Sequence, residues 1–396
     1  MKAGWTSKPI GDVFKVVNGG TPKTEIASNW DGPHAWITPA EMGKLDTPYI
    51  SESRRTLTDE GLRTSAELVP AGSIILSSRA PIGHLVINEI PMAFNQGCKG
   101  LIPSPALDTK FAYYFLLTNV PLLESLGTGA TFKELSGGKL KEVLFQFPEL
   151  DEQRRIVTAL DKVFADIASA KANAEKNLQN ARELFESHLD AIITNAQASG
   201  EIVPLSELAT DITDGDHMPP PKVERGLPFI TIGNIDKQTR AIDFTDTFQV
   251  PREYFDGLKA NKKPKRGDVL YTVTGSFGIP VLVEEDKEFC FQRHIGLIRP
   301  KADVDSIWLH YLLQSPQVFN QASDGATGTA QKTVSLKVLR NLQVPKISPR
   351  EQLAQVDTLR SVEIESRRLE SIYRQKLTAL DALKKSLLHQ AFSGQL

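Results

Sequence analysis

Polar side chains suited to binding gather in glycine-flanked loops at matching places in the two halves of the chain. Such loops can donate hydrogen bonds to phosphates and to base edges, because glycine lets the backbone approach a ligand and the loop projects its side chains. The candidates in the first half are Thr21, Lys23 and Thr24 of GGTPKT, Ser77, Ser78 and Arg79 of SSRAP, and Thr131 and Lys133 of GATFKEL. Those in the second half are Thr274 and Ser276 of TVTGSFG, Arg293 and His294 of FQRHIG, and Thr329, Gln331 and Lys332 of GTAQKT. The plainer alternative is that these residues only cap turns.

Residue patterns that carry out catalysis do not stand out in the sequence. The segment SGGKL from Ser136 lacks the upstream glycine and the hydroxyl of a nucleotide-binding GxxxxGK[ST] loop. The segment HMPPP from His217 is a proline-rich turn and not the Asn/Asp-Pro-Pro-aromatic motif of amino-methyltransferases. The seven histidines are scattered, and no pair of carboxylates stands at catalytic spacing. The sequence is therefore consistent with a protein that has no catalytic, cofactor or metal site of its own.

The composition is typical of a soluble globular protein with room for two domains. The chain has 396 residues, of which 40% are hydrophobic and 24% charged, and its net charge is −2. No apolar run reaches the length of a signal peptide or a membrane span. Cys98 and Cys290 lie in different halves without metal-ligand spacing, which predicts a reducing cytoplasmic location. The slightly negative net charge argues mildly against nucleic-acid binding, although a local basic patch could provide the positive charge that such binding needs.

The second half of the chain repeats the first. PAGSIILSSRAPIGHLV from Pro70 resembles PKRGDVLYTVTGSFGIPVLV from Pro264, so that Gly72 corresponds to Gly267 and Gly83 to Gly278. Further matches follow in the same order: GPHAWITPAEM with GLPFITIGNI, GTGATFKELS with GATGTAQKTVS, and FPELDEQRRIV with VPKISPREQLAQV. Several matches in one order indicate a duplicated unit.

Each repeat ends in a stretch that predicts one long helix. Proline is absent between Pro148 and Pro204 and again after Pro349, and each stretch holds a single glycine. Apolar and small residues recur in heptads. In the first stretch these are Ile156, Leu160, Val163, Ile167, Ala170, Ala174, Asn177, Ala181, Leu184, His188, Ala191 and Asn195; in the second they are Leu359, Val362, Ser366, Leu369, Tyr373, Lys376, Leu380, Leu383 and Leu387. A helix of about 45 residues would be roughly 65–70 Å long, which favours an antiparallel coiled-coil pair over two helices of a globular core. Asn177 and His188 would then fix the register of the pair.

The predicted fold class is α+β, with an internal pseudo-twofold repeat. Two mixed α/β domains, residues 1–148 and 200–348, alternate with the long helices 149–199 and 349–396. The terminal SGQL repeats the start of SGEIVPLSEL from Ser199, and PIGDV near the N-terminus supplies its continuation. We therefore expect Leu396 to lie near Trp5, so that the chain ends rebuild the junction that is covalent in the middle.

Two similar domains held apart by a paired helix suit a bipartite target. Duplex DNA is such a target, because a protein with twofold symmetry can meet two half-sites about one helical turn apart, roughly 34–36 Å. Because the two domains belong to one chain, they are free to diverge and to recognise unlike sequences.

The motifs GGTPKT, AWIT, SSRAPIG, FNQGCKG and GATFKELS, followed by the P…EQRRIV helix entry, resemble the specificity subunit of type I restriction–modification enzymes. The P…EQ entry, which recurs before both long helices, carries most of the likeness. The resemblance implies that residues 1–148 and 200–348 are target recognition domains and that the two helices set the spacer between half-sites.

The resemblance also implies partners. The helices would dock two modification (methyltransferase) subunits, which bind S-adenosylmethionine and methylate an adenine in each half-site of double-stranded DNA. Restriction subunits, with an ATP- and Mg-dependent motor and nuclease, would join that core. The chain itself would contribute sequence reading and no chemistry, and no membrane is involved.

Two other interpretations stay open. The first is a coiled-coil scaffold whose twin domains bind protein or carbohydrate, and the second is a self-contained nuclease or methyltransferase. The basic run Lys259, Lys262, Lys263, Lys265 and Arg266 is either a phosphate-binding patch or a solvated loop, since its counterpart in the first half has no basic residue.

Overall fold

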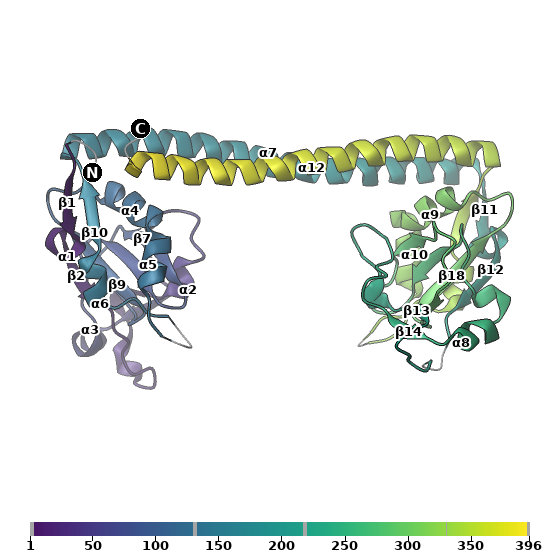
Figure 1. Ribbon diagram of the computed structural model, residues 1–396, viewed down its shortest axis with the longest axis horizontal. Coiled ribbons are helices and arrows are strands. Elements are labelled where there is room, and N and C mark those ends of the chain that lie inside the picture. Colours follow the sequence, from purple (N-terminus) through teal and green to yellow (C-terminus); the bar gives the residue numbers. More distant parts are fainter. Residues whose placement is uncertain (1–3, 130–132, 217–219, 330, 394–396) are drawn as a thin grey trace. The chain divides into compact units, whose positions relative to one another are not determined.

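The computed structural model describes residues 4–129, 133–216, 220–329 and 331–393. Contacts divide the chain into two compact units: unit 1 is Met1–Ala174 with Gln375–Leu396, and unit 2 is Glu175–Arg374. Two long helices, α7 (Leu150–Ser199) and α12 (Pro349–Ser393), each contribute to both units (Figure 1).

Unit 1 is a mixed α/β unit. Its strands are β1 (Thr6–Pro9), β2 (Phe14–Asn18), β3 (Trp30–Ile37), β4 (Tyr49–Ile50), β5 (Arg55–Leu57), β6 (Ile74–Ser78), β7 (Ile82–Asn88), β8 (Met92–Phe94), β9 (Cys98–Pro103) and β10 (Leu144–Phe147). They form a five-stranded sheet in the order β2-β9-β6-β7-β4, a three-stranded sheet β5-β3-β8 and a two-stranded sheet β1-β10. The short helices are α1 (Ile10–Val13), α2 (Pro39–Met42), α3 (Asp59–Ser65), α4 (Thr109–Thr118), α5 (Val120–Leu126) and α6 (Gly137–Glu142).

Unit 2 repeats this plan. Its strands are β11 (Glu201–Pro204), β12 (Ala209–Asp214), β13 (Leu227–Ile230), β14 (Phe248–Val250), β15 (Val269–Thr272), β16 (Pro280–Leu282), β17 (Cys290–Phe291), β18 (Ile295–Pro300) and β19 (Gln343–Lys346). The sheets are β12-β18-β15-β16, β14-β13-β17 and β11-β19. The helices are α8 (Arg252–Gly257), α9 (Ser306–Gln314), α10 (Pro316–Gly325) and α11 (Leu336–Arg340).

Equivalent glycines confirm the duplication. Gly72 and Gly267 have φ values of +80° and +91°, and Gly83 and Gly278 have +107° and +88°, a region that side chains with a Cβ rarely adopt. A Cβ on Gly83 would stand 2.4 Å from Val120 Cγ1, and one on Gly278 would stand 2.6 Å from Phe319 Cδ2. The repeat therefore extends to backbone geometry and to the close approach of the following helix.

Each unit builds its core between the main sheet and the long helices. In unit 1 the residues Phe111 and Leu116 of α4 share a buried cluster with Ile156 and Leu160 of α7. In unit 2 the matching cluster joins Trp308 of α9 to residues of α7 and α12. Figure 1 shows α4 and α9 directly beneath the long helices of their own units. Aspartate N-caps start both short helices: Asp108 accepts from the N–H groups at the start of α4, and Asp305 does the same for α9.

The long helices pair in antiparallel fashion within each unit. In unit 1 the Nζ of Lys171 on α7 lies 2.7 Å from Asp381 Oδ1 on α12. In unit 2 Arg182 pairs with Glu370 at 3.4 Å, and the Ser366 hydroxyl donates to the backbone carbonyl of Ala181. The small side chain of Ala181 lets the two backbones approach closely enough for that hydrogen bond.

The heptad prediction holds for only part of α7. Ile156, Leu160, Ile167, Ala174 and Ala181 are buried as expected, but His188, Ala191 and Asn195 are exposed. Beyond residue 184 the buried positions move to Leu189, Ile193 and Ala196, and Leu189 and Ile193 pack on the core of unit 2. A straight helix of 3.6 residues per turn drifts away from a seven-residue repeat, and here the side chains follow the domain that they cover. On α12, Lys376 and Leu383 are exposed for the same reason. His188 is therefore not a register residue.

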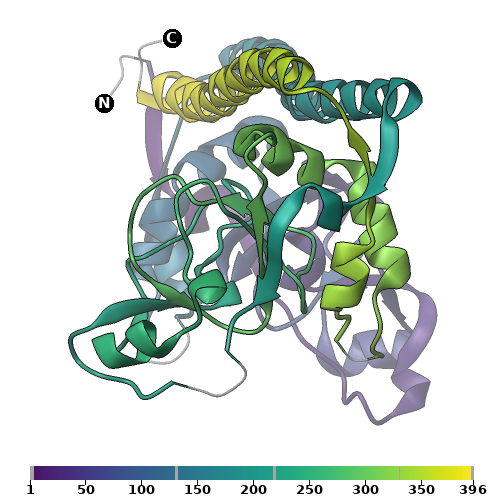
Figure 2. The same cartoon turned by 90° about the vertical axis from the view of Figure 1, so that its right-hand side faces the viewer.

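The chain ends meet the core of unit 1 in the way that the repeat requires. Ala391 and Phe392 of α12 join the cluster that contains Trp5. The ring centroids of Phe392 and Phe111 are 5.2 Å apart. Leu396 lies outside the described residues. β1 pairs with β10 as β11 pairs with β19, with Pro9 opposite Leu144 and Pro204 opposite Gln343. Figure 2 shows β11 leaving α7 and running beside β19, which leads into α12.

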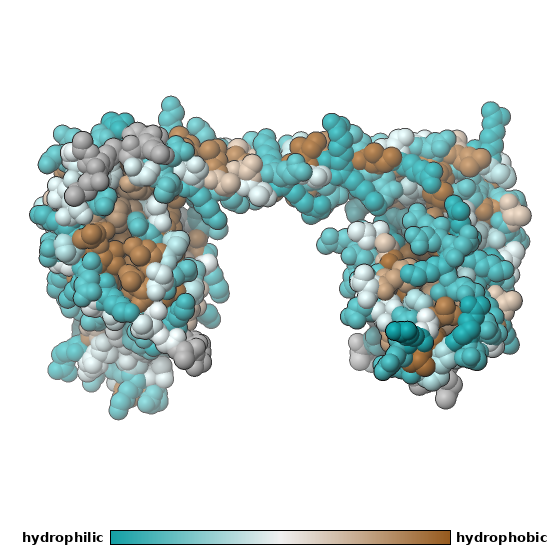
Figure 3. Space-filling view, viewed as in Figure 1, coloured by the Kyte–Doolittle hydropathy of each residue, from teal (hydrophilic) through white to brown (hydrophobic). Residues whose placement is uncertain are grey.

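The surface of unit 1 carries apolar side chains over α5 (Figure 3). Leu122 and Leu144 are among the exposed large hydrophobic residues, and they border a hollow of about 670 Å³. In unit 2 the corresponding positions are Gln321 and Gln343, and the Gln321 amide hydrogen-bonds both backbone groups of Gln343. Within the described ranges, no helix combines the length and apolarity that a membrane crossing requires.

Candidate nucleic-acid interface

Three loops of unit 1 are tied together by backbone hydrogen bonds. We call residues 77–81, 95–97, 127–129 and 133–135 the unit 1 loop cluster. Ser78 N–H donates to Gly97 O at 2.7 Å, and Leu135 N–H donates to Ser78 O at 2.8 Å. Thr128 and Glu134 exchange two backbone hydrogen bonds of 3.0 and 2.9 Å, which close the third loop on itself. The cluster is therefore a fixed frame from which side chains project.

Unit 2 contains the same frame in residues 272–277, 292–294, 326–329 and 331–334, the unit 2 loop cluster. Val273 N–H donates to His294 O at 2.9 Å, and Val334 N–H donates to Val273 O at 2.8 Å. Thr327 and Thr333 exchange hydrogen bonds of 3.0 and 2.8 Å. Each bond has its counterpart in unit 1, so the two frames are structurally equivalent.

The structure brings most of the predicted site residues to these frames. In unit 1 Arg79 is half-buried and Lys133 is exposed, while Thr131 lies outside the described residues. In unit 2 Ser276, Arg293, Thr329, Gln331 and Lys332 are exposed and His294 is half-buried. Thr21, Lys23 and Thr24 are exposed on the adjoining loop, where the Thr21 hydroxyl donates to Gln96 Oε1.

Three of the predicted contact residues are internal. Ser77 and Ser78 are fully buried at the end of β6, and Thr274 is 7% exposed. Ser77 Oγ donates to Pro81 O and accepts from His84 N–H, both at 2.8 Å, so it holds the turn. Thr274 Oγ1 accepts from Thr333 Oγ1 at 3.4 Å across two loops. Burial argues against direct contacts by these three side chains: every residue of β6 is buried through Ser78, and Thr274 is covered where two loops meet.

The two frames differ in the side chains around one turn. In unit 1 Gly97 has no side chain, and Arg79 Cγ and Nε lie 3.3 Å from where a Cβ would stand. Arg79 also lies 3.8 Å from Glu134 Oε2. In unit 2 the position of Gly97 is taken by His294, and the small Thr274 and Thr333 replace the charged pair. Unit 1 therefore places an ion pair where unit 2 places an imidazole and two hydroxyls.

Gln96 is not among the site residues predicted from the sequence. This exposed residue occupies the position in unit 1 that Arg293 occupies in unit 2. The signal was available, since FNQGCKG and FQRHIG align through their phenylalanines, Phe94 and Phe291, and place Gln96 against Arg293.

A family model of the type I restriction modification DNA specificity domain matches residues 2–178. This part of the chain is similar to type I restriction–modification specificity subunits. The specificity subunit of the type I restriction enzyme MjaIX from Methanocaldococcus jannaschii is 36% identical over 187 residues, which span 46% of this chain and 43% of that protein. The chain thus spans less than half of that relative's length.

Longer matches exist at lower identity. The type I restriction enzyme EcoBI specificity subunit from Escherichia coli is 24% identical over 333 residues, covering 77% of this chain and 70% of that protein. A chain solved in work on complex assembly and conformational transition of the type I R-M system gives a TM-score of 0.80 at 18% identity. The comparison covers 100% of this chain and 99% of the solved one, and it shows that the fold is shared.

The basic run lies next to the unit 2 loop cluster. Lys262 Nζ donates to Gly215 O at 3.2 Å, and a Cβ on Gly215 would stand 2.1 Å from Phe291 O at the start of the 292–294 turn. Lys263 Nζ donates to Asp256 O at 3.0 Å. Two of the five cations are thus bound to backbone carbonyls, and the other three, Lys259, Lys265 and Arg266, are exposed.

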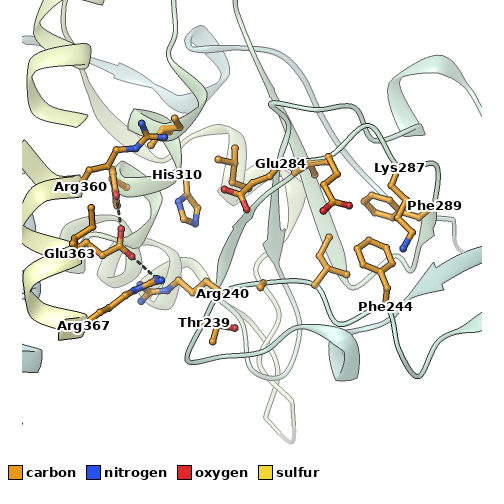
Figure 4. Close-up of a pocket in the computed structure, with 18 residues that line it drawn as sticks. Thr239, Arg240, Phe244, Glu284, Lys287, Phe289, His310, Arg360, Glu363 and Arg367 are labelled. Atoms are coloured by element: carbon orange, nitrogen blue, oxygen red, sulfur yellow. Dashed lines mark hydrogen bonds and ion pairs between the residues drawn. The ribbon is translucent and has the colours of Figure 1, made fainter. Parts of the chain in front are cut away.

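A second feature that sequence reasoning missed is a cavity of about 760 Å³ between the globular part of unit 2 and α12 (Figure 4). Several polar groups that line it bind one another or a neighbouring side chain. Glu363 accepts from Tyr311 Oη and from Arg367 Nη2, both at 2.6 Å, and Arg240, which has a φ of +52°, donates to Gln314. Burial and the Arg240 charge lower the pKa of His310 to about 4. The hydrogen bond from Tyr311 of α9 to Glu363 therefore joins the globular part of unit 2 to α12 at this cavity.

The remaining reactive groups are internal or dispersed. Cys98 and Cys290 are free and buried, and burial raises the pKa of each thiol to about 12. In the part of the chain that the structure describes, His, Cys, Asp and Glu residues form no group of three or more that could hold a metal ion. The arrangement of the loop clusters can bind a ligand by hydrogen bonds and charge.

Proposed function

We propose that the chain is the DNA sequence-specificity subunit of a type I restriction–modification enzyme. Residues 1–148 and 200–348 each read one half of a bipartite, gapped target. One observation carries the proposal: both units hold the same hydrogen-bonded loop frame and present different side chains from it. Such a fixed frame suits base reading, because a base edge is recognised only by donors and acceptors held in register.

The helices 149–199 and 349–396 would set the gap between the half-sites and dock two modification subunits. Support comes from apolar side chains on α12 that the chain itself leaves uncovered: Leu353 is 54% exposed and Ile364 is 69% exposed. The modification subunits would supply S-adenosylmethionine and methylate adenine, and restriction subunits would supply the ATP- and Mg-dependent motor and nuclease. This division of labour leaves the present chain non-catalytic, and its place of action would be the cytoplasm.

The test is binding of the assembled methyltransferase, this chain with its modification subunits, to a library of random duplexes. The proposal predicts enrichment of one gapped motif, with affinity that falls steeply as salt rises because phosphate contacts release counterions. Exchanging residues 200–348 for those of another family member should change one half of the motif and leave the other half and the gap intact. Enrichment of no motif by a folded complex would contradict the proposal.

A further inference from the structure

We propose that residues 96 and 293 each select one base: Gln96 reads an adenine in the half-site of the first domain, and Arg293 reads a guanine in the half-site of the second. The inference rests on the proposed function and assigns a base to two equivalent positions of the loop clusters. A Gln side chain can bind adenine N6 and N7 in a bidentate manner, and an Arg side chain can do so with guanine O6 and N7.

The two residues occupy the same place in their frames. Each stands at the tip of the turn that enters the second strand of the main sheet, β9 in unit 1 and β18 in unit 2. The next residue in each turn is fixed by a backbone bond, from Ser78 N–H to Gly97 O and from Val273 N–H to His294 O. Both side chains are exposed, so they project from a rigid turn without contributing to the core.

Gln96 is oriented by a neighbour. The hydroxyl of Thr21 donates to Gln96 Oε1, which holds the amide with its oxygen toward Thr21. One lone pair of that oxygen and both hydrogens of Nε2 stay available. An acceptor and a donor held side by side in this order match the N6 amino group and N7 of adenine.

Arg293 is oriented in the same manner by the next residue. Its Nε donates to His294 Nε2 at 3.3 Å. Burial and the Arg293 charge both lower the pKa of His294, so the imidazole is neutral near pH 7 and can accept that hydrogen bond. Both terminal amino groups of the guanidinium remain to face a ligand, and two parallel donors match guanine O6 and N7.

Neighbouring side chains are poorer candidates for the same task. Arg79 lies beside Glu134, which offsets its charge, and Ser77, Ser78 and Thr274 are buried. The contrast between an amide in unit 1 and a guanidinium in unit 2 is therefore the clearest chemical difference that the two frames present at one equivalent position.

The test uses the complex of this chain with its modification subunits and reads its methylation motif by sequencing the DNA of host cells. Arg293→Gln should move one position of one half-site from guanine toward adenine. Gln96→Arg should move one position of the other half-site from adenine toward guanine. In binding assays each variant should lose about 10- to 100-fold of its discrimination at that position and keep its discrimination elsewhere.

Arg293→Lys separates base reading from a phosphate contact. Lysine keeps the charge but lacks the paired donors, so base reading predicts relaxed specificity at the guanine, whereas a phosphate contact predicts an unchanged motif. Both positions are exposed, and thermal melting of each variant checks that the fold is retained. The inference is overturned if folded variants keep the wild-type motif, or if they lose methylation equally at all sequences. If the wild-type complex itself shows no sequence-specific methylation, the proposed function fails and this inference fails with it.

Discussion

Gln352 Oε1, in the first turn of α12, accepts a hydrogen bond of 2.7 Å from the backbone N–H of Asp305, the N-cap residue of α9. Gln352 Nε2 donates to Asp303 O and Ile347 O at 3.2 and 3.0 Å, and the side chain is almost fully buried. In unit 1 Gln153 bonds Asp108 N–H at 2.8 Å and the carbonyls of Ala106 and Pro148 at 2.9 Å. The glutamine of each EQ pair thus makes three hydrogen bonds that join the start of a long helix to the start of the short helix beneath it.

Replacing Gln352 with alanine should destabilise unit 2 by about 2–4 kcal/mol, because three buried backbone groups would lose their partner. Hydrogen exchange of α9 and chemical denaturation would measure the loss. Gln153→Ala should act in the same way on α4 in unit 1. The exposed Gln375 of α12 offers the control, and its alanine variant should change stability by less than about 0.5 kcal/mol. Equal effects of Gln352→Ala and Gln375→Ala would refute the role assigned to the buried amide.

The buried ion pair of Arg299 and Asp268 gives a second stability prediction. Arg299 donates to both carboxylate oxygens at 2.9 and 2.7 Å, and the Asp268 side chain is 3% exposed. Asp268→Ala should cost about 3–5 kcal/mol, because it leaves a shielded guanidinium without its counter-charge. The matched control is the exposed pair of Arg252 and Glu288, where Glu288→Gln should cost less than about 1 kcal/mol. Urea unfolding of both variants measures the free energy of unfolding that each one loses. Similar losses in the two variants would contradict the stabilising role of the buried pair.

His310 predicts a pH dependence of the stability of unit 2. Its pKa is lowered to about 4, by burial first and by Arg240 second, with Arg367 adding to the effect and Glu363 opposing it. In an unfolded chain the pKa of histidine is about 6.5, so between these values the unfolded state binds a proton that the folded state does not. Stability should therefore fall as the pH drops from about 6.5 toward 4 and should be insensitive to this group above that window.

At pH 5 this linkage amounts to a loss of up to about 2 kcal/mol relative to neutral pH. His310→Gln removes the titrating group and should flatten the decline between pH 7.5 and pH 5. Denaturation midpoints at the two pH values give the comparison. An identical decline in the wild type and the variant would show that other groups are responsible.

The exposed members of the basic run should act on phosphates. Because the run is joined to Gly215 beside the unit 2 loop cluster, neutralising Lys259, Lys265 and Arg266 together should lower DNA affinity without altering the recognised sequence. Each lost phosphate contact reduces the slope of log affinity against log salt by about 0.9, so a reduction of two to three is expected. Substituting the exposed Lys346, at the end of β19, with glutamine serves as the control. An unchanged slope would identify the run as a solvated loop.

Most of the fold could be predicted from local patterns in the sequence. The absence of proline and glycine predicts α7 and α12, because either residue destabilises a helix interior wherever it occurs, whatever the rest of the fold. The repeat could be predicted because Gly72, Gly83, Gly267 and Gly278 occupy positions of positive φ, and the glycines themselves can be aligned in the sequence. The length of each seam was less predictable, since residues 188–195 follow the domain packed against them and not the heptad.

The candidate site was harder to predict because it depends on burial at strand ends. SSR in SSRAP has the composition of an exposed loop, yet Ser77 and Ser78 complete a strand that is covered on both faces. The bond from Thr21 to Gln96 joins residues 75 positions apart in the chain, and no local pattern specifies such a pair. Aligning FNQGCKG with FQRHIG pairs Gln96 with Arg293, but only the structure shows that both side chains are exposed on equivalent turns.

The most direct test of the account is the methylome of cells that express this chain with its modification subunits, compared with cells that lack the chain. The account predicts a new N6-methyladenine motif made of two short specific halves separated by a fixed gap, with one half changed when residues 200–348 are exchanged. A soluble, assembled complex that adds no such motif, or one whose motif ignores the exchange, would contradict the claim that each domain reads half of the target.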